Sequence, residues 1–274
     1  VLVSEPPQDG QLPAYLIRDH AIAMSAGLGV RPPSRAAPTR RFAGIGAPQL
    51  APPPATRAGL RGMAIDVETI RALPSLPGAR EELEALSAAF PGEGTLLLTG
   101  AAATEAAVRT ASLSDYRILA FATHGLVGGQ IAGLDQPALV MTPGGLAGAE
   151  AQSGTTTAGD DGLLTASEIA RLRLAADWII LSACNTAAGD GPGNATYSGL
   201  ARAFQLAGAR TLLLSHWPVR DDAAARLSVA TVTAAAAGTE RSEALRQAQL
   251  ALIAASDLPG AASPSIWAPF VLIE

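Results

Sequence analysis

Two stretches decide the fold: RILAFATHG at residues 117–125 and WIILSAC at residues 178–184. Each holds a short run that is hydrophobic on both faces, which is typical of a strand buried inside a parallel sheet. Each run leads through small residues to a reactive side chain, His124 in the first and Cys184 in the second. Because helical segments separate such strands along the chain, the sequence predicts a three-layer α/β/α fold with a mostly parallel central sheet.

Further strands and helices are expected on both sides of these stretches. Strands are predicted at 42–48, 95–99, 138–141, 211–215 and 267–273, and helices at 77–90, 104–111, 165–172, 197–207, 221–237 and 240–255. Alternating residues at 15–24 predict a hairpin or edge strands, and the proline-rich stretch 31–62 predicts a surface loop. Residues 142–161 show no periodicity, so we expect a mobile loop that tolerates deletion.

The composition indicates one large folded domain. Of 274 residues, 49% are hydrophobic and 16% charged, so the chain can bury a core and is not disordered. No apolar run approaches the ~20 residues of a membrane span, and a net charge of −5 argues against contact with nucleic acid. All 19 basic residues are arginine, which excludes lysine-based catalysis. One cysteine excludes an internal disulfide, and with three scattered histidines it argues against a metal site.

His124 and Cys184 are expected to lie on one rim of the sheet, because carboxyl ends of neighbouring parallel strands share an edge. An imidazole 3–7 Å from a thiol, as we expect here, can activate it as a nucleophile. The backbone N–H groups of Gly125 and Cys184 are the expected donors to an oxyanion. Against this interpretation, a lone cysteine after a buried strand is usually only a small hydrophobic residue.

Six blocks in order resemble the CHAT domain family of caspase-like cysteine peptidases, related to caspases, separases and gingipains. The blocks are FATHG (121–125), DGLLTASEI (161–169), LSACNTAAGDG (181–191), GLARAFQLAGARTLLLSHWPVRDDAAA (199–225), ALRQAQLAL (244–252) and WAPFVL (267–272). The resemblance implies a caspase-like fold and a cysteine endopeptidase with a Cys184–His124 dyad, acting on protein or peptide substrates without a cofactor. It also implies TPR-type repeats upstream in the full-length protein, as partners of this domain.

Residues 1–274 are therefore expected to form a single CHAT domain, with peripheral strands and the proline-rich loop in 1–62 and the catalytic core in 63–274. The chain starts at Val1 without the pattern of a signal peptide, so we expect a start inside a longer protein and a cytoplasmic location.

Several alternatives stay open at this stage. A catalytically silent interaction module has the same fold, and a flavodoxin-like ligand-binding domain is disfavoured because GDGPGN, residues 189–194, lacks the glycine spacing of a phosphate loop. Asp161 and Asp190 are candidates for a substrate pocket that prefers a basic residue before the cleaved bond. His216 follows the 211–215 strand and is read first as a surface residue, with a place on the rim as the alternative.

Overall fold

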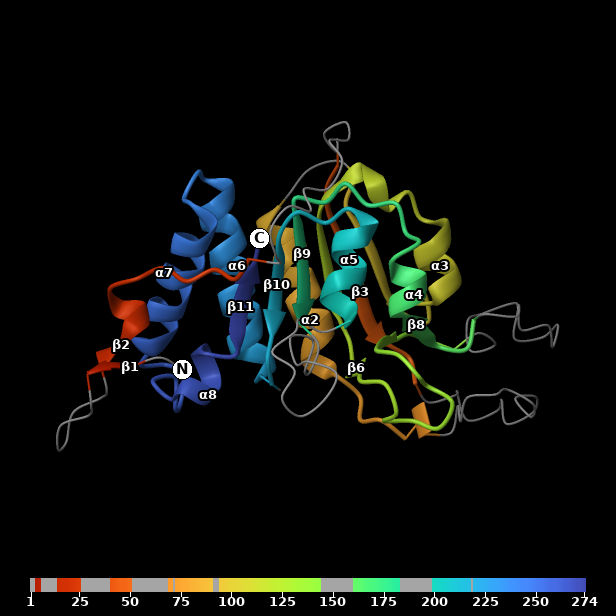
Figure 1. Cartoon of the computed structure of the whole chain (residues 1–274), viewed down its shortest axis with the longest axis horizontal. Helices are drawn as coiled ribbons and strands as arrows, with labels where there is room; N and C mark the ends of the chain where they lie inside the picture. The colour runs from red at the N-terminus through yellow and green to blue at the C-terminus, as the bar shows by residue number, and fades with distance from the viewer. Residues whose placement is uncertain are drawn as a thin grey trace.

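In the described part of the chain, six strands form the central sheet in the order β11-β10-β9-β5-β3-β4 (Figure 1). They are β3 (Arg40–Pro48), β4 (Leu96–Gly100), β5 (Tyr116–Ala122), β9 (Trp178–Ser182), β10 (Leu212–Ser215) and β11 (Phe270–Ile273). All neighbours pair in parallel except β11, which runs antiparallel to β10. This computed structural model describes residues 3–5, 14–25, 40–50, 69–70, 72–90, 94–143, 160–182, 199–217 and 219–274.

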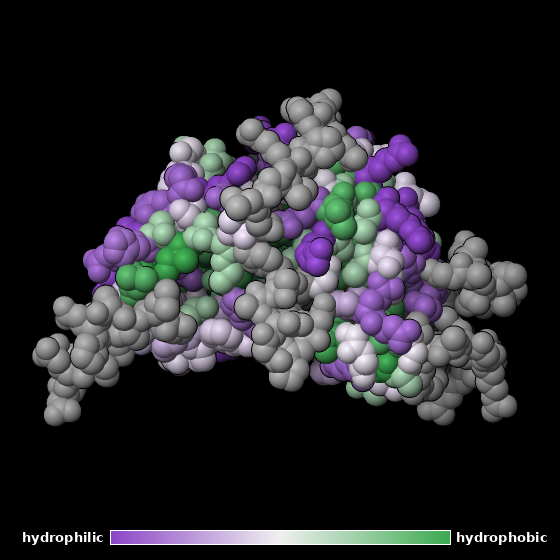
Figure 2. Space-filling view, in the orientation of Figure 1, coloured by the Kyte–Doolittle hydropathy of each residue, from purple (hydrophilic) through white to green (hydrophobic). Residues whose placement is uncertain are grey.

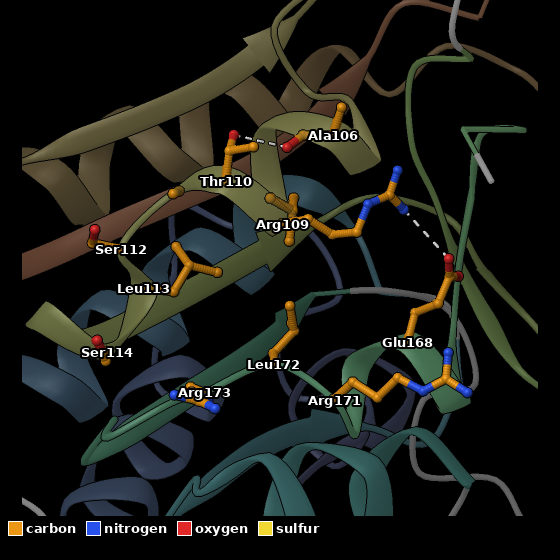
Figure 3. A pocket seen from close by; sticks show the side chains of 12 residues that line it. Ala106, Arg109, Thr110, Ser112, Leu113, Ser114, Glu168, Arg171, Leu172 and Arg173 are labelled. Carbon is orange, nitrogen blue, oxygen red and sulfur yellow. Dashed lines mark hydrogen bonds and ion pairs between the residues drawn. The ribbon is translucent and has the colours of Figure 1, made fainter. Parts of the chain in front are cut away.

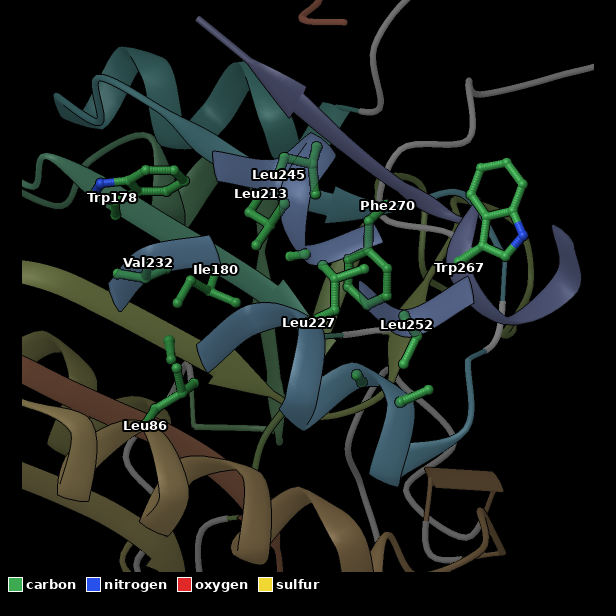
Figure 4. Packing of buried hydrophobic residues seen from close by; sticks show 14 of the residues in the cluster. Leu86, Trp178, Ile180, Leu213, Leu227, Val232, Leu245, Leu252, Trp267 and Phe270 are labelled. Atoms are coloured by element: carbon green, nitrogen blue, oxygen red, sulfur yellow. The ribbon is translucent and has the colours of Figure 1, made fainter. Parts of the chain in front are cut away.

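Helices cover both faces of the sheet, which confirms the three-layer α/β/α prediction. One face carries α2 (Pro77–Ala89), α6 (Asp221–Ala236) and α7 (Arg241–Ile253), and the other carries α3 (Glu105–Thr110), α4 (Ala166–Ile169) and α5 (Gly199–Ala207). Residues of β5 alternate between these two cores: Ile118 and Ala120 face the first, Leu119 and Phe121 the second. Figure 4 shows side chains of β9, β10 and the helices gathered in the first core.

A second, three-stranded antiparallel sheet lies beyond the carboxyl end of β5. Its order is β6 (Gly125–Leu126), β7 (Ala138–Val140) and β8 (Leu163–Thr165). The strand predicted at 138–141 therefore exists, but it belongs to this sheet. Thr142 ties it to the central sheet, because its hydroxyl donates to the Gly100 carbonyl at 2.6 Å and accepts from the Gln49 N–H at 2.9 Å.

The predicted helices and the other central strands are confirmed to within a few residues, and local signals explain why. The Thr104 side chain caps α3, and Thr165 with Glu168 forms a complete capping box on α4. The strand predicted at 267–273 begins later than expected, because α8 (Pro264–Trp267) precedes it and the strand runs over Phe270–Ile273. Most of the 142–161 loop, at residues 144–159, lies outside the described residues.

The strands predicted at 15–24 are largely wrong. Two residues, β2 (Ala14–Tyr15), pair with β1 (Val3–Glu5), and a 3₁₀ helix, η1 (Leu16–Arg18), follows. Tyr15 and Ile17 are buried, and their spacing imitates the alternation of a strand. The segment instead packs against α7, where the Arg246 side chain donates to the carbonyls of Ile17 and Arg18. Only Met24 then makes a parallel bridge, to Ile273.

The expectation that residues 1–62 are peripheral is wrong for β3, which lies between β4 and β5. Phe42, Ala43 and Ile45 are fully buried. Gly46 pairs with Ala122, and a Cβ on Gly46 would lie 2.0 Å from the Ala122 carbonyl oxygen. Only glycine permits this approach, which fixes the end of β5 just before His124.

Carboxyl groups anchor β8 to α3. The fully buried Glu105 accepts hydrogen bonds from the Gly162 N–H at 2.7 Å and from Arg109 at 2.9 Å, and Arg109 also contacts Glu168 at 3.3 Å. Burial raises the pKa of Glu105 to about 8. Burial also raises the pKa of Asp161, whose carboxyl group is hydrogen-bonded to Glu105. The cluster therefore retains a proton near neutral pH.

As the pH rises from 5 to 8, the free energy of unfolding of the wild-type protein should fall relative to that of Glu105→Gln. The unfolded Glu105 ionises near its ordinary pKa of 4.5, whereas the folded one stays protonated up to about 8. Its contribution to the free energy of unfolding is therefore complete below pH 4.5 and is lost as the pH passes through about 8. Urea unfolding of both proteins at pH 5, 6.5 and 8 measures this, with exposed Glu81→Gln as a control that should follow wild type. A difference between wild type and Glu105→Gln that is constant with pH would contradict it.

Candidate functional site

His124 lies at the carboxyl edge of the central sheet, between the end of β5 and the start of β6. Two hydrogen bonds to Val140 hold its backbone in place. The Thr123 hydroxyl donates to the Val140 carbonyl at 2.5 Å, and the Val140 N–H donates to the His124 carbonyl at 2.9 Å. The imidazole is half-buried, so it is held by the fold yet open to a ligand.

One ring nitrogen of His124 is already engaged. Nε2 lies 2.8 Å from the carbonyl oxygen of Pro74, in the segment that leads into α2. A carbonyl can only accept, so Nε2 carries a proton in this contact, and Nδ1 is the nitrogen that can accept a hydrogen bond when the ring is neutral. A contact of this kind can orient an imidazole as a general base, and that role of His124 stays a prediction. Sequence reasoning missed Pro74 because a backbone carbonyl is common to every residue and leaves no side-chain signal.

The backbone N–H of Gly125 points away from its neighbouring strand. Gly125 pairs with Leu139, and the hydrogen bond from Val140 to His124 marks this as a non-hydrogen-bonded pair of the antiparallel ladder. In such a pair, neither N–H faces the partner strand. Since β6 is the outer strand of its sheet, the N–H of the half-buried Gly125 faces away from β7, and its role as a donor to a ligand stays a prediction.

Cys184 lies outside the described residues, so its distance from His124 and the placement of its N–H stay predictions. The strand before it ends at Ser182, which pairs with Ala122. In sequence, Cys184 follows Ser182 by two residues, and His124 follows Ala122 by two.

Of the two residues predicted to line a substrate pocket, Asp161 and Asp190, the structure describes Asp161. The Asp161 carboxylate accepts from the Leu163 N–H at 2.9 Å and belongs to the Glu105 cluster. Asp190 lies outside the described part of the chain. Their role towards a substrate stays a prediction.

His216 follows β10 and is half-buried. The backbone N–H of His216 donates to the Pro269 carbonyl at 2.9 Å, and the imidazole ring stacks on the Trp217 ring with centroids 6.3 Å apart. Burial lowers the pKa of His216, so its ring is neutral at pH 7. Neither contact involves another titratable side chain.

In the described ranges of the chain, no group of three or more His, Cys, Asp or Glu side chains is placed to hold a metal ion. Within the same ranges, no helix combines the length and hydrophobicity needed to cross a membrane.

Comparison with known proteins gives the family. Among solved structures, the chain resembles the Arg specific cysteine proteinase gingipain R, with a TM-score of 0.44 and 9% sequence identity. That match covers 85% of this chain and 45% of the other, so the chain spans less than half the length of that structure. No curated protein matches the chain. The family model described as the CHAT domain matches residues 5–274, and the chain therefore belongs to the CHAT domain family.

Proposed function

We propose that this CHAT domain is a caspase-like cysteine endopeptidase, with Cys184 as nucleophile and His124 as general base. The observation that carries the proposal is the half-buried His124, placed at the sheet's carboxyl edge with Nε2 bound to the Pro74 carbonyl. This contact leaves Nδ1 to receive a proton. The family match supports the assignment, because caspase-like cysteine peptidases are the class that the CHAT blocks resemble.

The reaction would proceed in two stages. The Cys184 sulfur attacks the carbonyl carbon of the scissile peptide, and its proton passes to His124 Nδ1. The imidazolium, steadied by the Pro74 carbonyl, then protonates the leaving amine as the C–N bond breaks and a thioester remains. Water, deprotonated by His124, hydrolyses the thioester and frees the thiol. No cofactor enters these steps.

The oxyanion of each tetrahedral intermediate needs two donors. The Gly125 N–H is the first, because the strand pairing turns it away from β7. The Cys184 N–H is the second. Such donors are worth about 3–4 kcal/mol of transition-state stabilisation each. A side chain on residue 125 would crowd the approach of the substrate to this N–H.

Regulation by upstream TPR-type repeats is part of the proposal, as is a cytoplasmic site of action, where reducing conditions keep the thiol free. The contacts of residues 14–25 with α7 and β11 support regulation from upstream repeats. Arg246 of α7 donates to the carbonyls of Ile17 and Arg18 at 3.3 and 2.7 Å, and the Met24 N–H donates to the Leu272 carbonyl at 2.8 Å. Repeats joined to this segment would act on α7 and β11 first.

Cys184 should react with iodoacetamide faster than a model thiol at pH 6, because a protonated His124 lowers the pKa of a neighbouring thiol. His124→Ala should slow this reaction roughly tenfold or more. Mass spectrometry of the intact protein reports on Cys184 alone, since the chain has one cysteine. His20→Ala, which removes an exposed imidazole elsewhere, is the matched control and should leave the rate unchanged.

Equal alkylation of wild type and His124→Ala from pH 5 to pH 9 would show that no dyad exists. The silent interaction module would then replace the peptidase as the function. Circular dichroism of each variant shows that the fold is kept.

Cleavage of fluorogenic peptides should be faster after Arg than after Asp, and Cys184→Ala should abolish it. The relatives that cleave after basic residues, gingipains and separases, motivate this order, and Asp161 and Asp190 would supply the carboxylates. Asp190→Asn should lower kcat/KM for Arg peptides on the order of tenfold. The control Asp257→Asn removes an exposed carboxylate that pairs with Arg226 and should change nothing. Faster cleavage after Asp would reverse the assignment.

A further inference from the structure

A groove separates α3 and the 3₁₀ helix η2 (Leu113–Asp115) from α4 and the turn that follows it (Figure 3). Its volume is about 790 Å³. The floor is aliphatic, with Val108 and Leu113 buried and Leu172 half-buried. Four charged side chains also line it: Arg109, Glu168, Arg171 and Arg173.

The charges in this groove do not cancel. Arg109 contacts Glu105 at 2.9 Å and Glu168 at 3.3 Å, and the opposite charges of Arg109 and Glu168, which both line the groove, cancel. Arg171 and Arg173 are exposed, and the described part of the chain offers neither of them an ion pair. Three arginines and one glutamate leave the groove with a formal charge of +2 on a chain of −5. Figure 2 shows hydrophilic residues gathered over α3 and α4.

The shape and charge of the groove indicate which kind of anionic ligand would fit it. An apolar strip flanked by two guanidinium groups matches carboxylates that alternate with aliphatic side chains, because Arg binds carboxylate in a bidentate fork. Among the described residues that line the groove there is no aromatic side chain, so they offer no stacking platform of the kind that single-stranded nucleic acid uses.

The groove is also separate from the candidate active site. Leu113 lies just before the start of β5, and His124 lies just beyond its end. A seven-residue strand spans about 20 Å, so a ligand at Leu113 does not reach His124.

We propose that this groove binds an acidic peptide segment of a partner protein, with carboxylates on Arg171 and Arg173 and an aliphatic side chain against Leu113 and Leu172. The proposal does not depend on peptidase activity. Binding should weaken as salt rises, because the two guanidinium groups are exposed.

The test is fluorescence polarisation with a labelled octapeptide, Gly-Glu-Leu-Glu-Glu-Leu-Glu-Gly, and the Cys184→Ala chain to exclude cleavage. The double variant Arg171→Gln/Arg173→Gln should weaken binding tenfold or more. Leu172→Ser should weaken it severalfold. The double variant Arg80→Gln/Arg226→Gln removes the same charge from α2 and α6, on the other face of the sheet, and should bind as wild type does.

Four results would overturn the proposal. The first is equal affinity of wild type and the Arg171/Arg173 double variant for the peptide. The second is no binding of wild type at 1 mM peptide. The third is equal affinity for the peptide in which Gln replaces every Glu. The fourth is stronger binding of an oligothymidylate of the same charge, which would assign the groove to nucleic acid.

Discussion

Parallel pairing of β5 with β9 brings together segments that lie sixty residues apart, with Ala122 opposite Ser182. Both strands are buried on both faces, so each needs a helical layer above and below it. Polar side chains have no place along such strands and collect where the strands end. The position of His124 follows from this constraint, and so does the expectation for Cys184.

The edge of the sheet is not left to a flexible turn. The small β6-β7-β8 sheet continues directly from His124, and Val140 bonds to both Thr123 and His124. The buried Glu105 holds the other end of this sheet through the Gly162 N–H. The backbone around His124 is therefore fixed from the central sheet and from α3 together. Such support is what a site needs to keep its groups in a reactive geometry.

Much of the fold could be predicted because its signals are local. The apolar runs of β5 and β9, the Thr104 cap and the Thr165–Glu168 capping box all lie within a few residues of the element that they specify. His124 could be predicted at the edge for the same reason. The family blocks added the assignment to the CHAT domain family, which the family match over residues 5–274 confirms.

Other parts depend on contacts between distant segments, which no short pattern contains. β3 is an interior strand of the central sheet although it lies in a proline-rich stretch, and position 46 needs glycine because Ala122 approaches closely. The partner of the His124 ring is a main-chain oxygen fifty residues earlier in the chain. Alternation at residues 15–18 arises from packing on α7, so it predicted strands where a 3₁₀ helix forms.

The single bridge at Met24 has a consequence for the motions of the sheet. β11 is joined to β10 by a four-residue ladder. On its outer side, within the described residues, Met24 makes two backbone hydrogen bonds: its N–H donates to the Leu272 carbonyl at 2.8 Å, and its carbonyl accepts from the Glu274 N–H at 2.9 Å. A contact this small opens at a low free-energy cost compared with a full ladder. Amide protons at this border should thus exchange with solvent long before those of β5 and β9.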